Sequence, residues 1–229
     1  MARETLSTRA LLACGVLTGP MYVMVTLAEA LTRDGFDLRK HRFSWLTAGD
    51  LGWIHQLNMA GVGVGTVLLA LGVRQVMKPG RGSVWGPWLL ALTGVAYVVG
   101  GLLRADPVIG FPAGTTAEMV HTTWHGAAQN ASRSASTLFL ILTSGVIAGW
   151  FNAQGQRGWA WFYATGLPVV FALLTATGLA IGGNPAALAF LMTPWIWITA
   201  LAVHMYRRQR SRSGPVPTRQ GATAMPAAG

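Results

Sequence analysis

Residues 51–73 read LGWIHQLNMAGVGVGTVLLALGV and decide the fold class. The stretch has no Asp, Glu, Lys or Arg, and it exceeds the roughly 20 apolar residues that a helix needs to cross a bilayer. Its beginning is polar, with His55, Gln56 and Asn58, whereas the remainder is apolar and rich in glycine. We therefore predict a membrane-spanning helix over Leu51–Val73 with one polar end.

Further stretches of similar length and character occur before and after this one. They are Ala10–Leu31, Val84–Leu103, His121–Trp150, Trp159–Ile181 and Pro185–Tyr206. The chain is 52% hydrophobic and only 10% charged, whereas a soluble domain carries about 25% charged residues. Short alternating segments, which would indicate a membrane barrel, are missing. The sequence predicts an all-α, polytopic transmembrane bundle of about six helices over residues 1–206.

The first of these stretches also has a second interpretation. Arg3 and Arg9 precede it, and Ala28-Glu29-Ala30 near its end resembles a signal-peptide cleavage site. Its apolar part is longer than the 7–15 residues of such signals, and further spans follow. We expect an uncleaved first span.

The distribution of basic residues predicts the orientation of the bundle. Most of the 17 Lys and Arg residues lie before the first span, after the second and fourth spans, and at the C-terminal end. Loops rich in Lys and Arg stay in the cytoplasm, so both termini are expected there. Residues 207–229 are rich in Arg, Ser, Pro and Ala, which predicts a basic, disordered cytoplasmic tail. No basic face is interleaved with aromatic residues, so we expect no nucleic-acid partner despite the net charge of +10.

Unusual polar residues collect on the side opposite to the termini. The first loop there carries a motif made of Asp37, His41, Ser44, Asp50 and Trp53. A second set lies at or inside the helix ends, and we predict that it lines a polar crevice that opens outward. Its members are Glu29, His55, Asn58, Arg104, Asp106, His121, His125 and Arg133. The alternative for the first loop is that it carries charges only because it meets water.

Arg133 is the main support for the crevice. His121 and His125 are four residues apart, so in one helix they would share a face. Arg133 would then lie about 18 Å below His121, inside the hydrocarbon layer. A charged side chain at that depth usually faces a cavity or a counter-charge. By depth, Glu29 is the nearest expected partner, followed by Asp50 and Asp106. The alternative to a crevice is a single buried Arg–Glu clamp that holds the first and fourth helices together.

Several motifs together resemble one protein family. They are RDGFD (residues 33–37), HRFSWL (41–46), GDLGWIHQLN (49–58) and DPVIGFP (106–112), followed by the segment with His121 and His125. These motifs are similar to those of a bacterial and archaeal six-helix membrane family known as domain of unknown function 998. The chain departs from the family pattern at Arg42, where Pro is usual, and at Met59, where Phe is usual. The resemblance implies six helices, an important outer face and a place in the plasma (inner) membrane of a prokaryote, but no substrate and no catalytic residue.

Three functions are compatible with these residues. The first, which we favour, is binding or movement of a lipid headgroup or another small polar ligand, because Arg makes bidentate contacts to phosphate and carboxylate. The expected partners are therefore membrane lipid and a small polar ligand, with no cofactor.

The second function is an intramembrane hydrolase, and the third is a protein that carries a single haem. In a hydrolase, His121 and His125 could bind a metal with His55 or Asp106, although the Glu of the helical zinc motif is missing. Alternatively, Ser44 could act as the nucleophile and Asp106 as the base. A haem would take His55 with His121 or His125 as axial ligands. The sequence leaves open whether the protein is an enzyme.

Two glycine pairs have the spacing that permits close helix packing. They are Gly61/Gly65 and Gly178/Gly182. We predict packing notches within the bundle, with a homo-oligomer as the alternative.

Overall fold

The computed structural model describes residues 2–77, 80, 82–181 and 187–212, and its regular elements are helices. The α-helices are α1 (Ala2–Thr32), α2 (Gly52–Val76), α3 (Trp85–Leu102), α4 (Trp124–Ala153), α5 (Arg157–Ile181) and α6 (Ala187–Arg212). Two short 3₁₀ helices, η1 (Phe43–Thr47) and η2 (Ala117–Met119), lie in the connections. The described residues contain no β-strand, so the predicted all-α class is confirmed.

Five of the helices are long and apolar enough to cross a membrane. They are α1 over Thr8–Thr32, α2, α3, α4 and α6 over Ala187–Ser211. The protein is therefore a multi-pass membrane protein, as predicted. Helix α5 covers the predicted span Trp159–Ile181 but is not among these five, so its crossing of the membrane stays a prediction.

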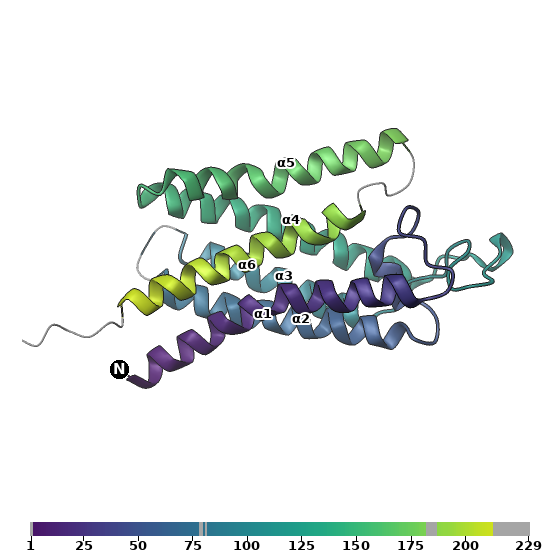
Figure 1. The fold of residues 1–229 in the computed structure, drawn as a ribbon, viewed down its shortest axis with the longest axis horizontal. Coiled ribbons are helices and arrows are strands. Elements are labelled where there is room, and N and C mark those ends of the chain that lie inside the picture. The colour runs from purple at the N-terminus through teal and green to yellow at the C-terminus, as the bar shows by residue number, and fades with distance from the viewer. Residues whose placement is uncertain (1, 78–79, 81, 182–186, 213–229) are drawn as a thin grey trace, which may run out of the picture.

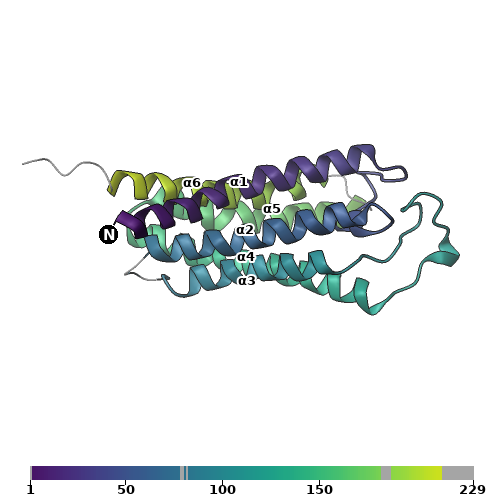
Figure 2. The same cartoon turned by 90° about the horizontal axis from the view of Figure 1, so that it is seen from below.

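Successive helices run antiparallel in an elongated bundle (Figure 1). Each of α1 to α4 packs against the next helix in sequence, and α1 also packs along α6 (Figure 2). The connections 33–51 and 103–123 meet at one end of the bundle, whereas the start of α1 and the end of α6 lie at the other. The polar loops predicted to share one side of the membrane thus share one end of the molecule. Which end faces the cytoplasm stays a prediction.

Glycines let three of the helices approach closely. A Cβ atom at Gly63 of α2 would lie 2.6 Å from the backbone oxygen of Gly94 in α3, and the reverse holds as well. Gly65, on the same helix, faces the hydroxyl of Thr18 in α1. Small residues at such crossings are typical of membrane helices. The predicted packing role is confirmed for Gly65, whereas Gly61 faces open space and Gly182 lies outside the described residues.

Two predicted boundaries differ from the structure. Helix α4 begins at Trp124 rather than His121, because Thr123 is its N-cap: the Thr123 side chain accepts a hydrogen bond from the Gly126 amide. The prediction that His121 and His125 share a helix face is therefore wrong. At the other end, α6 continues to Arg212, so the predicted tail begins with helical residues. Residues 213–229 of that tail lie outside the described residues.

Candidate functional site

The connection between α1 and α2 folds back onto the bundle and carries η1 with it. The side chains of Phe43, Ser44, Leu46 and Thr47 are buried. Gln129 of α4 donates from Nε2 to the Thr47 hydroxyl at 2.7 Å and to the Ser44 carbonyl at 3.2 Å. Irregular backbone near a membrane is tolerated where protein groups satisfy it, as they do here. The polar start of α4 is therefore partly explained by contacts to η1.

Arg33 holds the same segment from the other side. Its guanidinium donates to the Leu46 carbonyl and, at 2.6 Å, to the Ala48 carbonyl. Its carbon Cζ lies 4.9 Å from the centre of the Phe111 ring. Partial burial lowers the pKa of Arg33, while the nearby charge of Glu29 opposes that shift. Arg33 thus has a structural role that explains its place in the RDGFD stretch (residues 33–37).

Asp106, predicted to line the crevice, is bound to the start of α4. Its carboxylate accepts hydrogen bonds from the Thr123 amide at 3.0 Å and from the Thr123 hydroxyl at 2.5 Å. A side chain at Gly126 would collide with this carboxylate. A negative charge beside helix N-terminal amides is favourable. The geometry therefore gives Asp106 a helix-capping role.

Glu29 and His55 form a buried pair between α1 and α2. Oε2 of Glu29 lies 2.8 Å from Nδ1 of His55, and both side chains are almost entirely buried. The other polar atoms, Glu29 Oε1 and His55 Nε2, are buried without a hydrogen-bond partner. One helical turn away, Asn58 donates to the Tyr22 carbonyl and to the Thr26 hydroxyl. The predicted ion pair between Glu29 and Arg133 is wrong, because the Glu29 carboxylate faces His55.

The other predicted crevice residues do not join this pair. Arg104, His121 and His125 are exposed, and the His125 ring stacks on the exposed Trp124 ring at 3.6 Å. The described residues contain no group of three or more His, Cys, Asp and Glu side chains that could hold a metal ion. The arrangement therefore does not assemble the predicted zinc ligands. His55 is fully buried, whereas His121 and His125 are exposed, which gives no support to a haem site.

The residues of the loop motif are divided between interior and surface. His41 and Ser44 are buried, whereas Asp50 and Trp53 are exposed. The Nδ1 atom of His41 accepts a hydrogen bond from the Asp37 amide at 3.0 Å. The Arg39 amide donates to the Asp37 carboxylate, which lowers the pKa of Asp37. These bonds hold the loop in its conformation. Among the residues of this motif, Ser44 alone lines the cavity between η1 and helices α4, α5 and α6.

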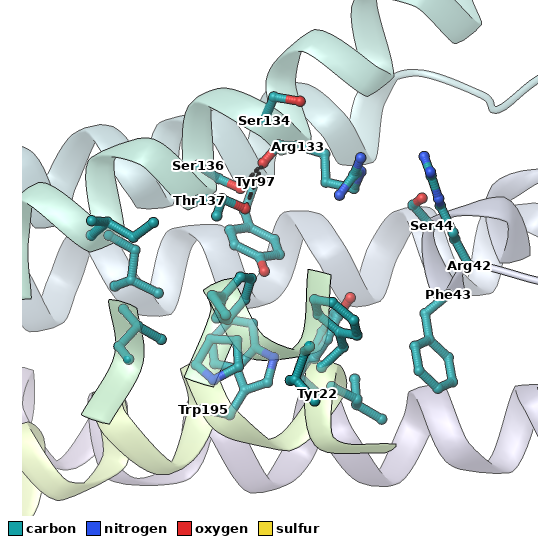
Figure 3. Close-up of a pocket in the computed structure, with 18 of the residues that line it drawn as sticks. Tyr22, Arg42, Phe43, Ser44, Tyr97, Arg133, Ser134, Ser136, Thr137 and Trp195 are labelled. Carbon is teal, nitrogen blue, oxygen red and sulfur yellow. Dashed lines mark hydrogen bonds between the residues drawn. The ribbon is translucent and has the colours of Figure 1, made fainter. Parts of the chain in front are cut away.

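A cavity of about 690 Å³ lies between η1 and helices α4, α5 and α6. Its polar part comes from the η1 segment and the first half of α4, and includes Arg42, Ser44, Arg133, Ser134 and Thr137. Its apolar part comes from the next turn of α4 and from α5 and α6, and includes Leu140, Ile141, Leu167, Phe171, Leu174 and Leu191. Arg42, Ser44 and Arg133 gather at one end of the pocket, away from Trp195 (Figure 3).

Arg133, which was predicted to line a polar crevice, lines this cavity. It lies nine residues after Trp124, about 14 Å along α4. No ion pair joins it to an acidic side chain of the described residues, and its Nε atom is buried without a hydrogen-bond partner. Another cation, Arg42, lines the same cavity. Arg133 therefore belongs to a basic site rather than to an Arg–Glu clamp.

One family model matches residues 16–204 of the chain, and its description is "Protein of unknown function (DUF998)". The chain belongs to this family. Comparisons with curated proteins and with solved structures found no match. Membership in DUF998 confirms the resemblance drawn from the loop motifs and assigns no activity to the cavity.

Most residues that line the cavity of this DUF998 protein were not predicted from its sequence. Tyr22, Tyr97 and Trp195 pack together there, with the ring centres of Tyr22 and Trp195 4.7 Å apart. These aromatic residues look like ordinary span residues in the sequence. Arg42 reads in the sequence as one more basic residue of the first loop, and its closeness to Arg133 depends on how that loop folds back.

Proposed function

We propose that this protein binds a membrane lipid in the cavity between η1, α4, α5 and α6. The lipid headgroup would occupy the end with Arg42, Ser44 and Arg133, and an acyl chain would lie against the apolar wall of α5 and α6. The observation that carries the proposal is that one continuous cavity joins a charged, hydroxyl-rich part to an apolar part. A molecule that matches both parts is amphiphilic.

The size of the cavity supports the same proposal. Pockets for small molecules usually measure about 300–1,000 Å³, and this one measures about 690 Å³. That volume accommodates a headgroup and part of a chain. In the orientation predicted from the basic residues, the headgroup would lie on the non-cytoplasmic side of a prokaryotic plasma membrane.

The proposal is tested by filling the apolar part of the cavity. Ile141 lines the cavity and is only partly exposed, so Ile141→Trp should reduce the lipid that stays bound through detergent purification, as measured by native mass spectrometry. Leu142, the next residue, is 46% exposed and does not line the cavity, so Leu142→Trp is the matched control and should retain lipid like the unmodified protein. Equal lipid retention in both variants would contradict the proposal.

A further inference from the structure

The charges around the cavity narrow the class of lipid, and this step rests on the function proposed above. We propose that the site selects a lipid whose headgroup carries a net negative charge, with its phosphate bound between the guanidinium groups of Arg42 and Arg133. A zwitterionic headgroup of the same size would bind less tightly.

The charged side chains that line the cavity favour an anionic headgroup. The charged residues among those that line the cavity are Lys40, Arg42 and Arg133, and all three are basic. Lys40 is already paired with the exposed carboxylate of Asp37 at 3.5 Å. The ammonium group of a zwitterionic lipid would meet cations in this part of the cavity, whose described lining includes no acidic side chain. An anionic headgroup would meet only favourable charges.

Arg133 lacks the protein hydrogen bonds that hold a comparable arginine in place. The Arg33 guanidinium, at the same end of the bundle, is bound to two backbone carbonyls. The buried Nε of Arg133 has no such partner, and Glu29, which could have neutralised it, is bound to His55. Two like charges beside each other in a partly buried site favour an anion between them. Guanidinium groups match phosphate oxygens with two parallel hydrogen bonds.

A buried hydroxyl among the residues that line the cavity also favours a phosphate group. Ser44 lines the cavity, is only 8% exposed, and its Oγ has no hydrogen-bond partner. Buried polar groups are usually satisfied, so an unpaired hydroxyl here indicates a missing acceptor. A phosphate oxygen placed between Arg42 and Arg133 would accept this bond (Figure 3).

A free phosphate ion shares this chemistry, but the rest of the cavity favours a lipid as its source. Inorganic phosphate would leave the apolar surfaces of Leu140, Phe171 and Leu191 unused. A lipid fills both parts, because its acyl chain lies against the apolar side chains while its phosphate meets the basic ones.

The test uses the full chain in nanodiscs of phosphatidylcholine that contain a small fraction of brominated phosphatidylglycerol or brominated phosphatidylcholine with the same acyl chains. The part of the tryptophan quenching that depends on the cavity reports lipid near Trp45 and Trp195, which both line it, whereas exposed tryptophans such as Trp88 and Trp161 report the surrounding lipid. We expect phosphatidylglycerol to bind roughly tenfold more tightly, because both lipids carry the phosphate but only the choline of phosphatidylcholine places a cation beside the basic side chains of the cavity. Ile141→Phe, which enlarges a side chain in the cavity without adding a tryptophan, should reduce the quenching that depends on this site.

Substitutions assign the preference to the two arginines. Arg133→Met and Arg42→Met should bring the two lipids to nearly equal affinity, and Arg133→Lys should lose part of the preference because it keeps charge without the planar fork. Arg104→Met and Arg39→Met are the matched controls, because both residues are exposed and neither lines the cavity. Ser44→Ala provides a milder test of where the phosphate binds, should Arg133→Met not fold: it should weaken the binding of both lipids several-fold, because both carry the phosphate.

The outcomes separate the inference from the function on which it rests. Equal affinity for the two lipids, with quenching still sensitive to Ile141→Phe, would overturn the headgroup inference and leave lipid binding intact. Quenching that Ile141→Phe does not affect would contradict both. If inorganic phosphate displaces phosphatidylglycerol at low millimolar concentration and does so equally well in Ile141→Phe, the site takes small anions and the lipid source is wrong.

Discussion

The Glu29 carboxylate and the His55 imidazole, 26 residues apart in sequence, join α1 to α2 through a contact of 2.8 Å that is sealed from water. The pair also borders the cavity wall, because the His55 ring lies 5.9 Å from the ring of Tyr22, which lines the cavity. Each partner retains one buried polar atom without a hydrogen bond. Loss of either side chain would therefore leave the other buried without a polar partner.

Removal of both members should cost less than the sum of the two single removals. We expect Glu29→Leu or His55→Leu to lower the free energy of unfolding by about 3 kcal/mol, because the remaining group is left buried and unpaired. The double variant Glu29→Leu/His55→Leu should lose clearly less than the sum of the two single losses. Equilibrium unfolding in mixed detergent micelles measures the three values. Additive losses would mean that the two groups do not support each other.

The start of α4 provides a second test, on Gly126 and Asp106. Gly126→Ala should destabilise the protein by about 1–2 kcal/mol, because the new methyl group displaces the Asp106 carboxylate from Thr123 and weakens the helix cap. Gly149→Ala in the same helix, where the added methyl group meets no atom within 4 Å, should be neutral or slightly stabilising. Thermal unfolding followed by circular dichroism measures both.

A further variant checks the cause of that loss. In an Asp106→Ala background the carboxylate is already gone, so Gly126→Ala should add little. A full additional loss there would show that the cost arises from another contact of Gly126.

The architecture was predictable because it depends on quantities that a sequence carries directly. The length and apolar character of Leu51–Val73 are enough for a spanning helix, and α2 starts one residue later than predicted. The start of α4 was predicted at His121 instead of Trp124, although the sequence contains the N-cap residue that marks the true start. Thr123 is a favourable N-cap residue, but the apolar and polar pattern from His121 onward favoured an earlier start.

The cavity could not be predicted in the same way, because it depends on which residues the tertiary fold brings together. Arg42 looked like one more basic loop residue until η1 folded against α4 and placed it near Arg133. Glu29 was paired with Arg133 on the basis of expected depth alone, whereas His55 lies directly across the α1–α2 contact. The depth of a residue in the membrane follows from its position in the sequence. Which neighbouring helix its side chain contacts is determined by how the helices pack.

Arg33 should be needed for the position of η1. Arg33→Met removes the donors to the Leu46 and Ala48 carbonyls, so residues 43–48 should exchange amide hydrogens at least tenfold faster. Arg39→Met, in the same loop, should leave their exchange unchanged, since the Arg39 contact to Asp37 uses its backbone amide. Hydrogen–deuterium exchange with mass spectrometry measures both variants. Unchanged protection in Arg33→Met would show that the Gln129 contacts suffice to hold η1.

Two glycines in α2 separate a packing requirement from a helix preference. Gly63→Ala places a methyl group against the backbone of Gly94, which has no side chain that could move aside, so α2 and α3 must separate. We expect a loss of about 1–3 kcal/mol in unfolding free energy, the usual cost of overpacking a closely packed site. Gly61→Ala, two residues earlier, meets open space and should be neutral or stabilising by about 0.5–1 kcal/mol, because Ala favours helix more than Gly. The two variants have the same composition, so a difference in their thermal midpoints reports the contact with α3, and equal midpoints would contradict the close approach of the two helices.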